Sequence, residues 1–341
     1  MKSRTALTLL VSCSPALVLA GLPKDQIVTS AFDFRPVVRI ERGDGGYGTG
    51  SVIGRFLYDN GLKGKLCVLT ADHVISTTGA QGGGIAGGLK IGTRNPDGSI
   101  GTPVTRNATV IGRQGKDGPQ GNGARKWDLA LLEIDWGFRD TEYDLLAGQR
   151  YSVDVWGGAN LSFTSAGFGT TGDLTKNGGP IDTGYEYFAN NPAHNDKKQR
   201  FWNNRMTLAP NNTAAPGGYV HDGLEWVLDN IDPAAKTGEG TGLPGDSGSP
   251  LLFDGADTLY QPKVDTIFTR SLRGVFNAFE RRTFVGGFDV DWGFKGFAVR
   301  ITDDNKKWID QRCSTVVPEP ASFVALSLAV SILALRRRPK G

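Results

Sequence analysis

The chain has 341 residues, of which 39% are hydrophobic and 21% are charged, so it can bury a sizeable core. Its 48 glycines favour a loop-rich β protein over a helical one, because glycine weakens helix interiors and serves turns and bulges. The net charge of +3 comes from basic residues at the two ends, and the body between them is slightly acidic. These values exclude a disordered chain, and they predict no nucleic-acid partner, which would need clustered Lys and Arg in the body.

Residues 1–20, MKSRTALTLLVSCSPALVLA, have the pattern of a secretory signal peptide. A basic start precedes an apolar stretch, and small residues surround Ala20, as in segments that are cleaved after export. We therefore expect an exported protein, with a buried first helix as the alternative.

Residues 21–317 predict one all-β region, because short apolar runs alternate with turn residues and no linker divides them. One helix is expected near the end, in TDDNKKWIDQ (302–311), where Asp303 and Asp304 suit the first turn. The candidate strands lie within 35–58 and 64–75 and at Ala108–Ile111, Leu129–Ile134, Ser162–Phe168, Ser249–Phe253, Leu272–Phe276 and Gly296–Ile301.

Two ranges look like insertions. Residues 76–101 are rich in glycine, and residues 170–245 are rich in Asn, Gly and Pro with little periodicity. Loops of this length are usually functional or mobile, so we expect both ranges to lie outside the core.

Residues 318–341 hold a Pro-Glu-Pro motif, an apolar run from Ala321 to Leu335 and an Arg-rich end. The run is shorter than the about 20 residues that usually span a membrane, so a lasting transmembrane helix is marginal. The three parts in this order resemble the PEP-CTERM sorting signal of Gram-negative bacteria. The resemblance implies transient membrane association, removal of the tail by a sorting enzyme, and delivery to the cell surface or extracellular matrix. A simple tail anchor held by the arginines is the alternative.

Export also bears on the three cysteines. Cys13 would leave with the signal peptide, and Cys67 and Cys313 would then form one disulfide or remain two buried thiols. No CxxC motif or Cys/His cluster is present, so we expect neither a metal nor a cofactor.

The stretch TGLPGDSGSP (241–250) places Ser247 in a tight turn, which suits either a nucleophile or an ordinary surface serine. A nucleophilic serine needs a base, a carboxylate that orients the base, and N–H donors for the oxyanion. His194 and His221 lie in polar loop settings, whereas His73 ends the apolar run CVLTADHV. Asp128 stands at the mouth of another apolar run, in KWDLALLEI. Taken alone, the histidine and the aspartate each also fit a structural role.

The segments LTADHV, WDLALLEI and GDSGSP, in the order His, Asp, Ser, resemble the motifs of the chymotrypsin/trypsin-like serine protease family. KGFAVRITDDNKKWIDQ resembles that family's last strand and C-terminal helix, so the resemblance spans most of residues 35–312. It implies an all-β fold of two six-stranded antiparallel barrels with a short C-terminal helix. The catalytic residues would lie in the cleft between the barrels.

By this resemblance Ser247 is the nucleophile, His73 the general base, and Asp128 the group that orients the imidazole. The backbone N–H groups of Gly245 and Ser247 would bind the oxyanion. The resemblance also places Thr241 at the base of the primary substrate pocket, where a trypsin-type enzyme carries Asp, so we do not expect selection for Lys or Arg. The pocket walls would include Asn277, Phe279 and Gly296.

Other positions depart from the family or match it weakly. The family's aspartate before the serine pairs with a new N-terminus after cleavage, and here the two groups would be Asp246 and Ile27. Neither Arg nor Lys precedes Ile27, so a local hydrogen-bonding role for Asp246 is the alternative. Asp72 replaces an alanine and is expected to perturb the charge state of His73. Val74 replaces a cysteine, so the loop after the histidine would be held by packing alone.

Together these observations predict an exported serine endopeptidase that acts on a protein or peptide substrate. The alternative is a catalytically inactive protease fold that serves as a surface or matrix binding module. A serine esterase of the α/β-hydrolase type is disfavoured, because such enzymes place Ser before Asp and His along the chain.

Overall fold

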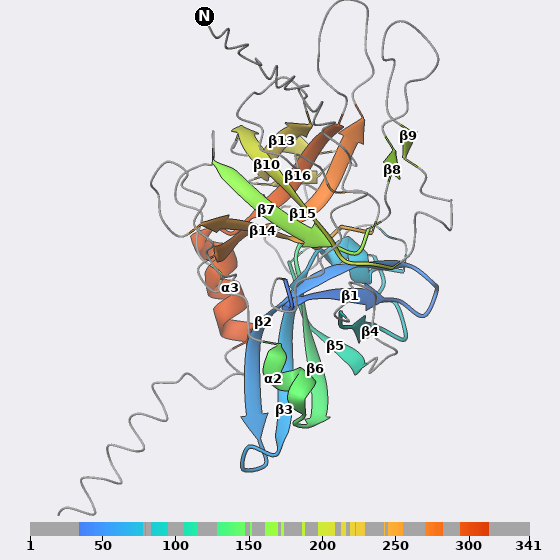
Figure 1. Ribbon diagram of the computed structural model, residues 1–341, viewed down its shortest axis with the longest axis vertical. Coiled ribbons are helices and arrows are strands. Elements are labelled where there is room, and N and C mark those ends of the chain that lie inside the picture. The colour runs from blue at the N-terminus through green and yellow to red at the C-terminus, as the bar shows by residue number, and fades with distance from the viewer. Residues whose placement is uncertain are drawn as a thin grey trace, which may run out of the picture.

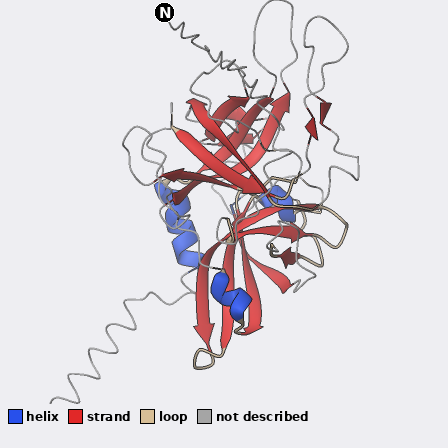
Figure 2. Cartoon of the chain, in the orientation of Figure 1, coloured by secondary structure: helices blue, strands red, loops and turns tan. Residues whose placement is uncertain are grey.

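The molecule consists of two closed β-barrels, one above the other in Figure 1, with helix α3 (Asp303–Cys313) beside them. Strands predominate and the helices are short (Figure 2). The expected fold class, all-β with two six-stranded antiparallel barrels and a short C-terminal helix, is confirmed. The computed structural model describes residues 34–77, 79, 83–94, 106–114, 128–146, 151, 161–169, 172–173, 186–187, 197–208, 213–215, 219–221, 223–228, 242, 245–254, 270–281 and 294–313.

The first barrel closes in the strand order β1-β2-β3-β6-β5-β4, with every pair antiparallel. Val, Ile and Leu dominate its buried positions, as expected of strands that face a core. The strands are β1 (Val37–Glu41), β2 (Tyr47–Tyr58), β3 (Lys63–Thr70), β4 (Lys90–Gly92), β5 (Arg106–Arg113) and β6 (Ala130–Phe138).

The second barrel closes in the order β10-β13-β16-β15-β14-β7, again with antiparallel pairs. Two small sheets pair β8 with β9 and β11 with β12. The barrel strands are β7 (Ser162–Gly167), β10 (Arg200–Leu208), β13 (Gly223–Leu228), β14 (Pro250–Asp254), β15 (Arg270–Arg281) and β16 (Phe294–Arg300), and the small-sheet strands are β8 (Gly172–Asp173), β9 (Glu186–Tyr187), β11 (Thr213–Ala215) and β12 (Tyr219–His221).

The two ranges expected to be insertions contain barrel strands, so this expectation is wrong for those strands. Residues 170–245 supply β10 and β13, and residues 76–101 supply β4. Alternate residues of β10 are buried, but Asn204 is one of them, and Glu225 is buried in β13. Buried polar side chains hide the apolar alternation by which a strand is recognised in a sequence.

One apolar cluster continues from the first barrel into the second, where it includes Phe168, Leu272 and Val299. A smaller cluster fills the second barrel around Trp226 and Phe276. Because close-packed interiors resist deformation, the shared cluster fixes one barrel against the other.

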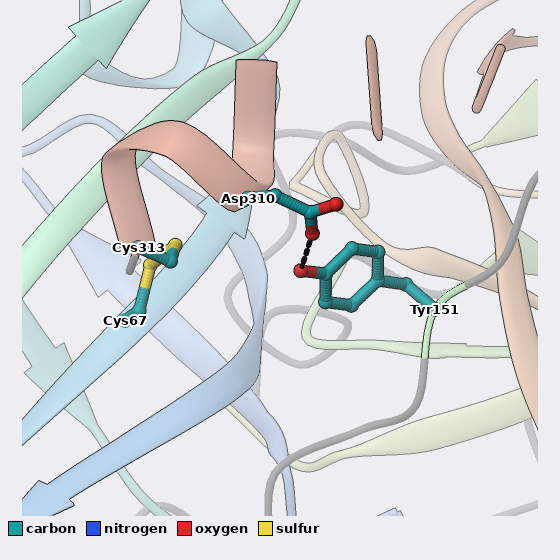
Figure 3. The surroundings of a disulfide bond; sticks show 4 residues. All are labelled: Cys67, Tyr151, Asp310 and Cys313. Carbon is teal, nitrogen blue, oxygen red and sulfur yellow. Dashed lines mark hydrogen bonds between the residues drawn. A yellow bond between two sulfur atoms is a disulfide. The ribbon is translucent and has the colours of Figure 1, made fainter. Parts of the chain in front are cut away.

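Helix α3 follows β16 of the second barrel and packs on the first. Thr302 accepts the N–H of Asn305 over 3.2 Å, which caps the helix start. At its other end Cys313 forms a disulfide with Cys67 of β3, so the alternative of two free thiols is excluded (Figure 3). The buried Ile309 joins the first barrel's core. The helix therefore ties the end of the second barrel to the first.

Residues 1–20 and 318–341, which carry the expected signal peptide and sorting signal, lie outside the described residues. Of the helices that the structure describes, none has the length and apolar character needed to cross a membrane. The structure also describes a short helix, α2 (Thr141–Leu145), whose N-cap Asp140 accepts the N–H of Tyr143 over 2.8 Å.

Candidate active site

His73 lies in a 3₁₀ turn, η1 (Asp72–Ile75), directly after β3. Ala71 is still extended, and its carbonyl oxygen accepts the N–H of Val74 over 3.2 Å, which closes the turn. Val74 and Ile75 are buried and fasten the turn to the barrel. The imidazole is thus held at the end of a rigid strand, with 18% of its side chain exposed.

The carboxylate of Asp128 contacts His73 at two points. Oδ1 accepts the backbone N–H of His73 over 2.8 Å, and Oδ2 lies 2.5 Å from the ring atom Nδ1. The sheet brings them together, because Thr70 and Ala130 are register partners in β3 and β6, each close in sequence to one of the two residues. The Asp128 side chain is fully buried. It can therefore hold the tautomer that carries the proton on Nδ1 and leaves Nε2 as an acceptor.

The charges around His73 raise the pKa of its imidazole above the ordinary value. Burial of the ring acts in the opposite direction, because it disfavours the charged form, but the charge and hydrogen bond of Asp128 outweigh it. Asp72 adds to the rise in pKa, and Arg42 opposes it. The ring therefore takes up a proton more readily than a free histidine, as a general base must.

Ser247 lies in a turn before β14 that both barrels hold. From the first barrel, Thr49 donates its N–H to the carbonyl oxygen of Ser247 over 2.8 Å and its hydroxyl to that of Gly245 over 3.0 Å. From the second, the carbonyl oxygen of Phe276 accepts the N–H of Gly248 over 2.7 Å. The serine turn therefore bridges the two barrels.

Two glycines are required by the shape of this turn. Gly245 and Gly248 have φ angles of +95° and +89°, in the region that favours glycine. A Cβ at Gly245 would collide with the ring of Tyr47, and one at Gly248 with the carbonyl oxygen of Thr49. Both positions therefore need glycine for conformation and for close approach.

The N–H groups of Gly245 and Ser247 donate to no other residue that the structure describes. By contrast, the N–H groups of Gly248 and Ser249 are both bonded to carbonyl oxygens of the chain. Binding a developing oxyanion requires N–H donors that are held in place and bond to no other group. The N–H groups of Gly245 and Ser247 meet this requirement within the described residues.

The turns that carry His73 and Ser247 meet at Gly48 of β2. A Cβ built on Gly48 would lie 2.6 Å from Cγ1 of Val74 and 3.1 Å from the carbonyl oxygen of Ser247. No hydrogen bond joins the Ser247 hydroxyl to the His73 ring within the described part of the chain. Such bonds are often long before substrate binds and shorten in the complex.

Asp246 is buried, and its carboxylate lies against the loop after β7. It accepts the N–H of Gly169 over 2.7 Å, and a Cβ at Gly167 or Gly169 would collide with it. This hydrogen bond fits the local role that the sequence leaves open for Asp246. Ile27, the expected source of a new N-terminus, lies outside the described residues.

The expected substrate-pocket residues are only partly described. Thr241 lies outside the described residues. Asn277 is buried at a bulge in β15, and its side-chain amide finds no hydrogen-bond partner among the described residues. Phe279 is the register partner of Gly296. A Cβ at Gly296 would collide with the indole of Trp226, which belongs to the core of the second barrel, so this glycine faces packed side chains.

Hydrogen bonds hold the loop after His73, so the expectation of packing alone is wrong. The N–H of Thr77 donates to the carbonyl oxygen of Gly84, and that of Ala86 to Ile75, each over 2.8 Å. Arg42 donates to the carbonyl oxygen of Ser76 over 2.7 Å. Two backbone bonds and one side-chain bond therefore hold this loop against η1 and the residue that follows β1.

Two residues of the site are not predicted from the sequence: Thr49, which bonds to both Gly245 and Ser247, and Arg113, which pairs with Asp72. A signal for Thr49 was present in YGTGS, where glycines on both sides mark a close approach of neighbouring chain. No signal in the sequence pointed to Arg113.

No family model matches this chain, and no curated protein matches it. One similar solved structure is neuropsin, a serine protease expressed in the limbic system of mouse brain, with 13% identity, a TM-score of 0.49, and coverage of 84% of this chain and 98% of that one. Another is HL collagenase, with 16% identity, a TM-score of 0.46, and coverage of 85% and 96%. Neither comparison assigns a role to a residue.

Proposed function

We propose that this chain is a serine endopeptidase that uses Ser247, His73 and Asp128. The observation that carries the proposal is the double contact of the Asp128 carboxylate with His73, at the backbone N–H and at Nδ1. The serine turn supports it, because the turn is clamped between the barrels and leaves the N–H groups of Gly245 and Ser247 unpaired within the described residues.

In this proposal, Ser247 Oγ attacks the carbonyl carbon of a peptide bond while His73 Nε2 takes the hydroxyl proton. Asp128 keeps the ring oriented and stabilises the imidazolium that forms. The oxyanion of the tetrahedral intermediate accepts the N–H groups of Gly245 and Ser247. His73 then gives its proton to the leaving amine, and water activated by the same base hydrolyses the acyl-enzyme.

The proposed substrate is a protein or peptide without a selected Lys or Arg at the cleaved position. Thr241 would supply no negative charge at the base of the pocket, and Asn277 and Phe279 would line it. Peptide-library profiling checks this point, because strong preference for Lys or Arg would contradict the pocket assignment.

We also propose that the protein is exported through residues 1–20 and sorted to the cell surface or extracellular matrix through residues 318–341. The support is the order of the motifs in the sequence. Fractionation of cells that make the full chain, beside a chain without residues 318–341, tests sorting. The same distribution for both chains would contradict it.

The catalytic proposal is tested by labelling the secreted protein with a fluorophosphonate probe, which reacts with an activated serine. We expect Ser247→Ala and His73→Ala to abolish labelling. Ser249→Ala is the matched control, because Ser249 lies in the same turn and its hydroxyl has no hydrogen-bond partner among the described residues. A wild-type protein that stays unlabelled after N-terminal processing would instead support the inactive binding module.

A further inference from the structure

A buried ion pair stands directly beside His73. Asp72, the preceding residue, pairs with Arg113 at the end of β5, and their side chains are 0% and 5% exposed. Nε of Arg113 lies 2.5 Å from Oδ1 of Asp72, and Nη2 lies 2.9 Å from Oδ2. This bidentate arrangement uses the planar fork of the guanidinium, which a lysine does not offer.

Arg113 also holds the loop that returns after His73. Its Nη1 donates to the carbonyl oxygen of Gly83 over 2.6 Å. One side chain therefore joins β5, the turn η1 and the returning loop. No hydrogen bond links Arg113 to the imidazole in the described part of the chain, and its hydrogen bonds near the site go to Asp72 and Gly83.

The positive charge of Arg113 matters because His73 has two carboxylates beside it, those of Asp128 and Asp72. The charged groups around the ring are Asp128 before β6, Asp72 on its own turn, Arg42 between β1 and β2, and Arg113 on β5. Asp128 and Asp72 both favour the imidazolium. Without the positive charge of Arg113 beside it, Asp72 would hold the proton on the ring more firmly, whereas a general base works best when its pKa lies near the working pH.

We propose that Arg113 is a positioning residue for His73: it partly offsets the charge of Asp72 and fixes the turn η1, so that Asp128 remains the main carboxylate acting on the imidazole. The catalytic meaning of this role rests on the proposed function. Its effect on the ring does not, because protonation of His73 can be followed without any activity.

The test is an NMR titration of the His73 ring in the full chain, assigned from the signal lost in His73→Ala. Arg113→Met removes the positive charge beside the Asp72 carboxylate and raises the titration midpoint of His73. Asp72→Asn removes the negative charge of this side chain and lowers the midpoint. We expect each shift to be about half a pH unit or more, because a nearby charge commonly moves a pKa by about one unit. The double variant, with neither charge, returns toward the wild-type midpoint.

Two further variants separate charge from structure. Lys65→Met breaks a pair with Glu133 on the same barrel, 2.7 Å in length, and leaves the His73 midpoint unchanged. Arg113→Lys keeps the charge without the fork, so the midpoint stays near that of the wild type while the melting temperature falls. If Arg113→Met does not fold, the His73 midpoints of Arg113→Lys and Asp72→Asn still test the inference.

Shifts of the two single variants in the same direction, or no shift in Asp72→Asn, would overturn the inference. A double variant that keeps the midpoint of either single variant would do so as well. Opposite shifts in a protein that fluorophosphonate does not label would retain the positioning role and reject the proposed protease activity. Where labelling occurs, its pH midpoint moves with the NMR midpoint in each variant.

Discussion

The backbone N–H of Thr49 donates to the carbonyl oxygen of Ser247 over 2.8 Å, which joins β2 of the first barrel to the serine turn. The carbonyl oxygen of Thr49 accepts the hydroxyl of Thr70 over 2.6 Å, close to where β3 enters the turn of His73. One residue of β2 is therefore bonded to both segments of the candidate site. The sheet, more than the surface loops, sets where the serine lies relative to the histidine.

Thr49→Val tests this relationship, because it keeps the backbone bonds and the shape but removes the hydroxyl. The hydroxyl donates to Gly245 and accepts the N–H of Phe168 over 3.1 Å. Leaving such buried groups unpaired costs about 1–3 kcal/mol of unfolding free energy. We expect fluorophosphonate labelling to slow by about tenfold or more, because a misplacement of about 1 Å can cost on the order of 10²-fold. Thr109→Val, at an exposed position of β5, is the control, and equal labelling rates for both variants would contradict the expectation.

Gly245→Ala should remove most labelling, because the added Cβ meets the Tyr47 ring and φ is +95°. The N–H of residue 245 is kept but moves with the displaced backbone, and loss of one oxyanion donor typically costs about 10²–10³-fold in turnover. Gly137→Ala is the control for backbone strain. The φ of Gly137 is also positive, at +73°, but no atom lies within 4 Å of the added Cβ. We expect it to lower the unfolding free energy by about 1–2 kcal/mol and to leave labelling intact. Comparable labelling loss in both variants would trace the effect to backbone strain instead of the oxyanion donor.

The sequence predicts the candidate site best where a reactive side chain lies next to an apolar run. The runs that end at His73 and begin after Asp128 became β3 and β6, and their pairing explains the contact between the two residues. The order of three short motifs also predicted the two-barrel fold, which the structure confirms.

The sequence was least informative where polar groups are buried. Asn204 and Glu225 interrupt the apolar patterns of β10 and β13, so the sequence does not mark these segments as strands. Asp72 is an unusual residue before the histidine, but its partner Arg113 lies 41 positions away, and only the fold brings them together. Long-range pairs between polar residues leave no periodic trace, so local patterns do not reveal them.

The pH dependence follows from the raised pKa of His73, whose ordinary value is 6.5. Labelling needs the neutral ring, so its rate should rise with pH through a midpoint above that value. A pKa raised in the folded state stabilises the fold below the unfolded value, and this stabilisation is lost as pH rises through the folded value. The stability difference between wild type and Asp128→Asn should therefore be largest in acid and shrink with rising pH. Denaturant unfolding across this pH range measures it.

Asp128→Asn should also lower the labelling midpoint, because it removes the charge that favours the imidazolium. Loss of the correct tautomer typically reduces turnover by on the order of 10⁴-fold, so the maximal rate should fall as well. Lys65→Met again serves as a control for charge changes elsewhere on the barrel. A midpoint in Asp128→Asn at or above that of the wild type would contradict the role given to Asp128.

The disulfide between Cys67 and Cys313 should stabilise the fold without taking part in the chemistry. It links positions 246 residues apart, and removing a native disulfide typically costs about 2–5 kcal/mol, because the unfolded chain gains freedom. Cys67→Ala/Cys313→Ala should lower the unfolding free energy by about this amount. Tyr151→Phe, which removes the 2.5 Å bond to Asp310 of the same helix, should cost only about 1 kcal/mol (Figure 3). Denaturant unfolding gives both values, and labelling of the folded double variant should match that of the wild type. Lost labelling in a double variant of native stability would instead show that the docking of α3 shapes the candidate site.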